Sequence, residues 1–496
     1  MSANSGHHSP HEGSSSSLPR VLGVTTATAI VVGTVIGSGV FKKPQAIAEA
    51  VPYSGVVLLV WVVGGLLTLL GALAYAEVAA LFPRTGGNYV FLREAYGRLA
   101  GFLWGWVEFW IIRSASLAAL ATIFAESVAE LVANDSVQRL FGLPNGTNLA
   151  AWGQRLLTIG VLLGLGLVNI RGVRLGGGLQ VIVTLVKVGS LLAIALVPWL
   201  FLTWPDSLSS SRLPSVDHLH PIWPTTPGGL TLSGLATAFL SVLWAYHGWM
   251  NLAPIAGEVR NPQRNLPLAL LLGVGLLVLL YCSVNLAYYL VLSGSEMAGF
   301  KDRPVAAVFA LELLGPLGGA AVSAAILLSV FGSLNGNLLV GPRLLVAMGE
   351  DRLAPTTLAS IHVVYRTPAV AIGVFAIWAS LQVLAVAILT DLKALTTTSP
   401  FDLLTNFAMF GAVIFETLAV LAIFRFRQLL PNAERVYRCP GYPWVPALYV
   451  LLPGFVLLNM FTAQPIEALT GVGFILLGAL LYFTLGLNRR AGCCDR

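Results

Sequence analysis

Hydrophobic residues occur in long runs along the chain, and short polar or Pro/Gly-rich connectors separate these runs. A helix of about 20 apolar residues crosses the hydrocarbon core of a bilayer. Because lipid offers the backbone no hydrogen-bond partner, such runs are predicted to be helical. We therefore predict an all-α integral membrane protein with twelve transmembrane helices. The runs cover residues 21–50, 54–81, 99–131, 150–170, 177–202, 233–257, 266–293, 318–347, 367–390, 402–424, 443–461 and 466–487.

Composition excludes a solvated globular protein. Of the 496 residues, 56% are hydrophobic and 10% are charged, whereas soluble domains carry about 25% charged residues. The net charge of +6 would indicate nucleic acid only if the basic residues gathered on a soluble face. They lie mostly between apolar runs, so the predicted surroundings are the lipid bilayer and not nucleic acid. The four cysteines form neither a disulfide framework nor a metal quartet, and no metal or cofactor is predicted.

The distribution of basic residues predicts the orientation in the membrane. An even number of spans places both termini on one side, and that side holds 18 of the 28 Lys and Arg residues against eight on the other. The positive-inside rule then predicts that both termini are cytoplasmic in a cell membrane. Residues 1–20 are rich in Ser and His and lack the apolar core of a signal peptide. They are predicted to be a disordered cytoplasmic tail.

Two of the runs are interrupted at mid-membrane depth. Gly33, Gly37 and Gly39 weaken the first run as a helix by roughly 1 kcal/mol each, although small residues also permit close helix packing. The sixth run contains the polar, aromatic and glycine residues of 243–249. Runs one and six hold matching places in two sets of five, and paired interruptions of this kind indicate a transporter site between inverted repeats.

Four segments carry a resemblance to a known family: residues 33–41, the loop 82–89, the block 244–267 and residues 329–336. Together they resemble the amino acid-polyamine-organocation (APC) superfamily, and most closely its L-type amino acid transporter family. The resemblance implies a LeuT-like core of ten spans in two inverted repeats, followed by two extra C-terminal helices. The implied divisions are residues 1–20 (tail), 21–202 (first five-helix repeat), 203–430 (extracellular loop and second five-helix repeat), 431–487 (two C-terminal helices) and 488–496 (cytoplasmic tail).

The same resemblance implies a substrate site at the two interruptions. Ser38 and Gly39 would hold the carboxylate of an amino acid, carbonyl groups at both breaks would accept from its ammonium, and Trp244 would cover it as an aromatic lid. Two broken helices supply amide donors and carbonyl acceptors without a fixed net charge, as a zwitterion requires. The implied substrate-binding residues are Ile36, Gly37, Ser38, Gly39, Trp244, Ala245, His247 and Gly248.

Lys187 lies deep in the fifth run, where a charge costs roughly 2.5 to 3.5 kcal/mol on insertion scales. In sodium-dependent relatives a cation bridges the first and eighth spans, and an ammonium group at this place resembles a built-in substitute. Its expected partners are first-span carbonyls and a hydroxyl such as that of Ser333. Sodium independence is therefore predicted. Burial disfavours a charged ammonium, so proton coupling stays open, as does a structural lysine that reaches the interface.

His247 stands where relatives of cationic selectivity carry Asp. A histidine supplies no fixed negative charge, and Lys42 and Lys43 on the predicted outer side would repel cations. Cationic substrates are therefore not expected, and neutral substrates are favoured over acidic ones. His247 either titrates near physiological pH or is a hydrogen-bonded core residue.

Three further charges lie inside runs: Glu108, Arg113 and Glu416. Residues five apart are poorly placed for contact on an α-helix, so Glu416 is predicted to pair with Arg113 across spans. Glu416 is also a candidate for proton handling.

These features predict a sodium-independent transporter of neutral L-amino acids that works by exchange and alternating access. A proton-coupled symporter is the alternative, and an amino-acid-binding membrane sensor is the rival from another class. An enzyme is not predicted, because no nucleophile or metal constellation is present. Eukaryotic members of the resembling family bind a heavy chain through a cysteine between spans three and four. Residues 128–150 contain no cysteine, so no disulfide-linked heavy chain is expected.

Overall fold

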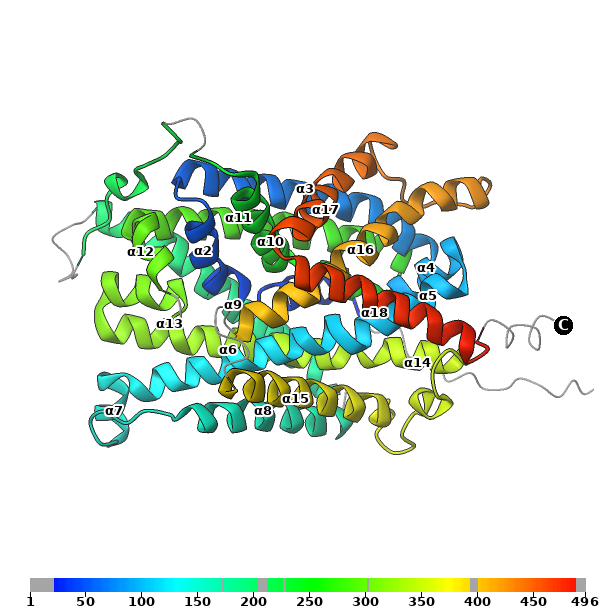
Figure 1. The fold of residues 1–496 in the computed structure, drawn as a ribbon, viewed down its shortest axis with the longest axis horizontal. Coiled ribbons are helices and arrows are strands. Elements are labelled where there is room, and N and C mark those ends of the chain that lie inside the picture. Colours follow the sequence, from blue (N-terminus) through cyan, green and yellow to red (C-terminus); the bar gives the residue numbers. More distant parts are fainter. Residues whose placement is uncertain are drawn as a thin grey trace, which may run out of the picture.

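A computed structural model describes residues 22–171, 174–203, 212–225, 229–300, 303–392 and 400–487 (Figure 1). The predictions for the tails 1–20 and 488–496 fall outside these residues. Within the described part, regular structure is helical, apart from one isolated parallel bridge between Leu22 and Val259. The all-helical prediction is thus confirmed.

The helices follow the predicted runs closely. Four runs are divided into shorter pieces, and five short helices lie in connectors. The elements are α1 (Val24–Val35), α2 (Gly39–Ala50), α3 (Ser54–Leu81), α4 (Asn88–Tyr96), α5 (Arg98–Val107), the π-helix η1 (Glu108–Arg113), α6 (Ser114–Ala133), α7 (Asp135–Phe141), α8 (Ala151–Arg171), α9 (Arg174–Thr203), η3 (Val216–Leu219), α10 (Leu232–Tyr246), the 3₁₀ segment η4 (Trp249–Glu258), α11 (Pro262–Val291), α12 (Gly294–Gly299), α13 (Val305–Val340), α14 (Pro342–Glu350), η5 (Thr356–Ala359), α15 (Ala369–Asp391), α16 (Pro400–Leu429), α17 (Trp444–Ala463) and α18 (Pro465–Thr484).

Length and hydropathy identify the membrane-spanning helices. Among the described residues, 10 helices are long and apolar enough to cross a bilayer, and the bent pair α1 and α2 raises this number to 11. The sixth predicted run forms α10, which has only 15 residues, followed by η4. The chain is therefore a multi-pass membrane protein.

The eighth predicted run starts too late. Its helix begins at Val305 and not at residue 318, and it contains Gly315 and Pro316, two residue types that usually interrupt a helix. In the structure they form a kink inside the helix, where Gly315 has a φ of 73°. Glycine adopts this left-handed conformation without the steric cost that a side chain would add.

Many of the long helices pack in pairs. The most extensive contacts join α3 to α11, α6 to α13, and α8 to α15. Helix α1 contacts α9, α11, α13 and η4, while α17 lies against α3 and α10, and α18 against α5. The break between α1 and α2 is consequently enclosed by other helices.

A buried carboxylate fastens the loop after α16. Glu77, which is 3% exposed, pairs with Arg427 at 2.8 Å and with Arg435 at 3.2 Å. It also accepts a hydrogen bond from the backbone amide of Cys439 at 2.7 Å. Burial, followed by the charge of Glu77, raises the pKa of the Cys439 thiol to about 11. This thiol is consequently unreactive at neutral pH.

Replacement of Glu77 by Ala is expected to destabilise the protein by about 3–5 kcal/mol, because two arginines lose their buried counter-charge. Thermal unfolding in detergent measures the effect. The matched control is Glu94→Ala, which removes an exposed pair with Arg93 and is expected to cost about 0–1 kcal/mol. Equal melting temperatures for the two variants would contradict the role of Glu77 in fastening the loop after α16.

Candidate functional site

The two interrupted helices meet at their breaks. Helix α1 ends at Val35, α2 starts at Gly39, and the two helices are bent by 41°. Helix α10 ends at Tyr246, and Gly248, with a φ of 107°, begins the turn into η4. A Cβ atom on Gly39 would lie 2.5 Å from the Cα of Ala245. Only glycine permits so close a contact between the breaks.

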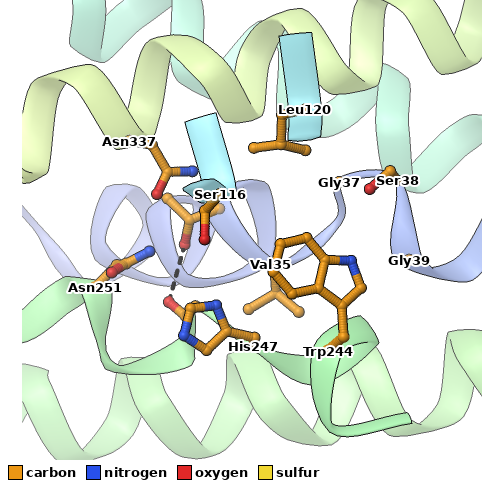
Figure 2. Close-up of a pocket in the computed structure, with 12 residues that line it drawn as sticks. Val35, Gly37, Ser38, Gly39, Ser116, Leu120, Trp244, His247, Asn251 and Asn337 are labelled. Atoms are coloured by element: carbon orange, nitrogen blue, oxygen red, sulfur yellow. Dashed lines mark hydrogen bonds between the residues drawn. The ribbon is translucent and has the colours of Figure 1, made fainter. Parts of the chain in front are cut away.

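A cavity lies between the breaks and the helices α6 and α13 (Figure 2). Six residues predicted from sequence line it: Gly37, Ser38, Gly39, Trp244, His247 and Gly248. Sequence reasoning missed six others, which are Thr34, Val35, Ser116, Leu120, Asn251 and Asn337. Isolated Ser and Asn residues on the third and eighth runs carry no local signal, because only the fold brings these runs to the break.

Two predicted site residues lie behind the cavity wall. The carbonyl of Ile36 accepts hydrogen bonds from Lys187, Ser329 and Ser333, so it is not free for a ligand. Ala245 packs against Gly39. Neither residue lines the cavity, and their role in binding a substrate stays a prediction. The sequence places residues at a break but does not show which way each carbonyl points.

Ser38 carries an unused hydroxyl. It occupies the N-cap position of α2 and is 1% exposed, yet its side chain accepts no hydrogen bond from that helix. Among the described residues its Oγ has no hydrogen-bond partner at all. A serine at an N-cap normally bonds a first-turn amide. Here the hydroxyl and the first amides of α2 lie together at the cavity, an arrangement that suits an anion.

Lys187 on α9 is fully buried and bridges α1 and α13. Its Nζ donates to the carbonyls of Gly33 at 2.6 Å and Ile36 at 2.8 Å, and to Ser333 Oγ at 2.8 Å. These are the partners expected from the sequence. The ammonium group therefore holds the carbonyl end of α1 just before the break.

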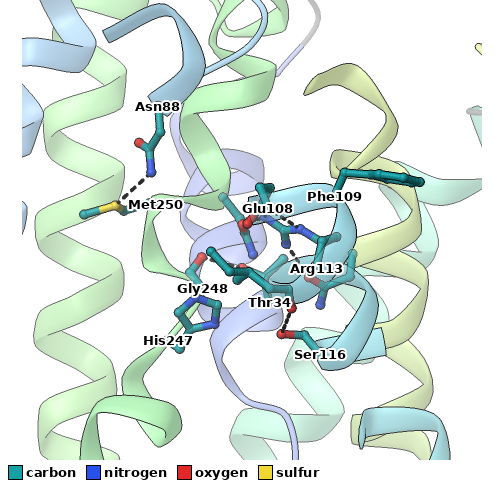
Figure 3. Close-up of polar contacts among 12 residues, drawn as sticks. Thr34, Asn88, Glu108, Phe109, Arg113, Ser116, His247, Gly248 and Met250 are labelled. Atoms are coloured by element: carbon teal, nitrogen blue, oxygen red, sulfur yellow. Dashed lines mark hydrogen bonds and ion pairs between the residues drawn. The ribbon is translucent and has the colours of Figure 1, made fainter. Parts of the chain in front are cut away.

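The pairing predicted between Glu416 and Arg113 is wrong. Arg113 bonds Glu108, with Nη2 to Oε1 at 2.5 Å (Figure 3). The segment Glu108–Arg113 is a π-helix, whose i→i+5 spacing brings together residues that an α-helix would separate. Arg113 also donates to Asn251 and Asn337, two of the residues that line the cavity. The pair thus supports the cavity from the side of α5 and α6.

Glu416 pairs instead with His247. The distance from Nε2 to Oε1 is 3.0 Å. The His247 ring lies parallel to the ring of Trp244, at 9° and 6.0 Å between centroids. His247 is therefore a hydrogen-bonded wall residue of the cavity.

Phe401 contacts Trp244 edge-on, with 6.1 Å between the ring centroids. The Nζ atoms of Lys42 and Lys43 lie over the ring of Phe401, at 5.1 Å and 4.9 Å from its centroid. Neither lysine lines the cavity, and Lys42 is paired with Glu126 at 2.7 Å. The charge of Lys42 is thus compensated, which weakens the expectation that the two lysines repel cations from the site.

A cavity between two broken helices inside a bundle of membrane-spanning helices defines a membrane transporter. The profile of the Amino acid permease family matches residues 22–485. The chain belongs to this family, a branch of the APC superfamily, and it is a transporter and not an enzyme.

Individual relatives match over almost the whole chain. The serine/threonine exchanger SteT of Bacillus subtilis is 32% identical over 478 residues, which cover 95% of this chain and 98% of the relative. The human b(0,+)-type amino acid transporter 1 is 30% identical over 473 residues, 95% of this chain and 89% of the relative. The mouse large neutral amino acids transporter small subunit 2 is 29% identical over 479 residues, 94% and 81% respectively.

Proposed function

We propose that the protein is a sodium-independent exchanger of neutral L-amino acids that works by alternating access around the cavity at the two helix breaks. The observation that carries this proposal is the unpartnered hydroxyl of Ser38 beside the first amides of α2. A buried polar atom without a partner is costly, and a substrate carboxylate would satisfy it. Exchange and neutral substrates appear in the names of two relatives, the serine/threonine exchanger SteT and the large neutral amino acids transporter.

We place the substrate carboxylate against Ser38, Gly39 and the positive end of α2. The ammonium would face the carbonyl ends of α1 and α10, where helix dipoles favour a cation. Trp244 would cover the substrate, backed by Phe401. Each part of a zwitterion then meets an unlike charge, and no fixed net charge is needed in the membrane.

We further propose twelve spans, with the bent pair α1 and α2 as the first, and α10 with η4 as the sixth. Helix packing supports two inverted repeats over 21–202 and 203–430, because it joins span two with seven, three with eight, and four with nine. Residues 431–487 would add the last two spans. On this count both termini are cytoplasmic by the positive-inside rule, and no disulfide-linked heavy chain is required.

Lys187 supports sodium independence. Its Nζ has three oxygen partners on α1 and α13, so a lysine side chain already fills the space between these helices. A sodium ion at the same place would have to compete with Nζ for these oxygens.

Exchange in proteoliposomes tests the proposal. Uptake of a labelled neutral amino acid is expected only when unlabelled amino acid is inside, and it should be unchanged when sodium is replaced by choline. Uptake into empty vesicles driven by an inward proton gradient would favour the symporter alternative. Strict sodium dependence would overturn the role of Lys187, and amino acid binding without any movement would favour a sensor.

Replacement of Ser38 by Ala tests the carboxylate site. The variant is expected to fold normally, because the hydroxyl has no partner to lose. Loss of one hydrogen bond to a charged group should raise the KM for exchange by about 10-fold, equivalent to about 1.5 kcal/mol. Amino acid amides, which lack the carboxylate, should bind both proteins equally weakly. An unchanged KM for the free amino acid would place the carboxylate elsewhere.

A further inference from the structure

The side chain of His247 separates two cavities. One is the central cavity described above, and the second lies among α3, α10, η4, α16 and α17, where Thr68, Met409, Glu416 and Tyr449 contribute to its wall. Of the described residues, His247 alone lines both. Figure 2 shows its ring beside Trp244 at the wall of the central cavity. A change in the protonation of His247 therefore changes the charge at the wall of the central cavity directly.

The hydrogen bond to Glu416 limits the states that His247 can adopt. Its side chain is 12% exposed, that of Glu416 is 14% exposed, and Nε2 lies 3.0 Å from Oε1. An ionised carboxylate only accepts hydrogen bonds, so Nε2 keeps its hydrogen in both protonation states of the ring. Nδ1 is then an acceptor in neutral histidine and a donor in the cation. The net charge of the pair is −1 in the first state and zero in the second.

No other charged side chain lines the central cavity in the part of the chain that the structure describes. The groups that face the pair are Thr68 and Tyr75 from α3, Tyr449 from α17, and Trp244 and Trp249 from α10 and η4. None of these side chains changes charge between about pH 5 and 8, where histidine ordinarily titrates. Arg113, reached through Asn251 and Asn337, is itself paired with Glu108. The pair is therefore the variable charge at the cavity wall.

We propose that the His247–Glu416 pair sets which side-chain charge the transporter accepts, and that a proton changes this selectivity. The inference rests on the proposed transport of amino acids and concerns the side-chain part of the same site. With neutral His247, the carboxylate of Glu416 behind it gives the pair a net charge of −1, which disfavours substrates with anionic side chains. Protonation removes that charge, so anionic side chains become acceptable and cationic ones lose their advantage.

Matched substrates separate this effect from general effects of pH on transport. Glutamate and glutamine have the same shape but differ by one charge, and lysine and norleucine form a similar pair. The measurement is the inhibition constant of each compound against exchange of a labelled neutral amino acid, at about pH 5.5 and about pH 8. We expect the glutamate to glutamine ratio of inhibition constants to fall about tenfold on acidification, the order expected for one charge across a partly buried site. The lysine to norleucine ratio should rise.

Two variants assign the effect to the pair. Glu416→Gln removes the negative charge and should lower the glutamate to glutamine ratio about tenfold at both pH values, whereas Glu416→Asp should restore the original ratio. His247→Gln should abolish the dependence of the ratio on pH. The control is His362→Gln, on an exposed loop, which should behave as the unmodified protein.

The outcomes distinguish this inference from the proposed function. Ratios that do not change with pH in the unmodified protein, while glutamine is still exchanged, would overturn the inference and leave the transport proposal standing. The same holds if Glu416→Gln exchanges glutamine with unaltered ratios. Absence of exchange for every neutral amino acid would overturn the proposed function itself.

Discussion

Replacement of Gly39 by Ala is expected to reduce exchange by about 10- to 100-fold. A Cβ at this position would lie 2.5 Å from the Cα and 2.9 Å from the Cβ of Ala245, distances at which backbone must move. Overpacking of this kind costs about 1–3 kcal/mol, and here it would push apart the two breaks that form the cavity. Exchange kinetics in proteoliposomes, with thermal unfolding measured in parallel, would check the result.

The matched control for this variant is Gly164→Ala. Gly164 lies on α8, and an added Cβ there would meet nothing within 4 Å. Alanine also has the higher helix propensity, so this variant should retain full exchange. If Gly39→Ala exchanged substrate at the original rate, the close contact of the two breaks would not be needed for transport.

Replacement of Lys187 by Met is expected to reduce exchange by at least about 100-fold. The change removes three hydrogen bonds, so the carbonyls of Gly33 and Ile36 keep only their serine donors. Each lost hydrogen bond costs about 0.5–1.5 kcal/mol. Part of this cost should appear as a lower melting temperature. The larger part should appear in transport, because Gly33 lies in the last turn of α1 and Ile36 is its C-cap at the break.

The neighbouring variant Thr184→Ala provides the comparison for Lys187→Met. Thr184 is also buried on α9 and donates to the carbonyl of Ala29, at 3.1 Å, one turn or more before the break. The Thr184→Ala variant should retain most of the exchange activity, since the hydrogen bond to Ala29 does not hold the end of α1. Equal losses in both variants would indicate that Lys187 serves only to fasten α9 to α1.

The sequence predicted the position of the breaks because their causes are local. Gly37, Gly39 and Gly248 weaken helices wherever they occur, and a lysine in an apolar run such as Lys187 requires oxygen partners. The direction in which the backbone turns at a break is not local. Ile36 and Ala245 were consequently placed in the site although their atoms face Lys187 and Gly39.

The pairing of charges was predicted poorly for a related reason. The prediction that Glu108 and Arg113 do not contact each other depends on α-helical spacing. The segment is a π-helix, whose turn holds one more residue, so the two side chains do contact each other. Because Arg113 pairs with Glu108 in its own segment, Glu416 does not pair with Arg113, and it forms its ion pair with His247. The sequence contains no simple signal for a π-helix, since its formation depends on the neighbours that fill the widened turn.

The bridge between Leu22 and Val259 joins the segment before α1 to the segment after η4 through main-chain atoms. The amide of Leu22 donates to the carbonyl of Glu258, and the amide of Arg260 donates to the carbonyl of Leu22, at 3.0 Å and 2.8 Å. Side-chain replacement leaves these atoms in place, with proline as the exception because it lacks the amide hydrogen. The link between the ends of the two broken helices can therefore outlast extensive sequence divergence, and it would escape detection in any survey that compares amino-acid identities alone.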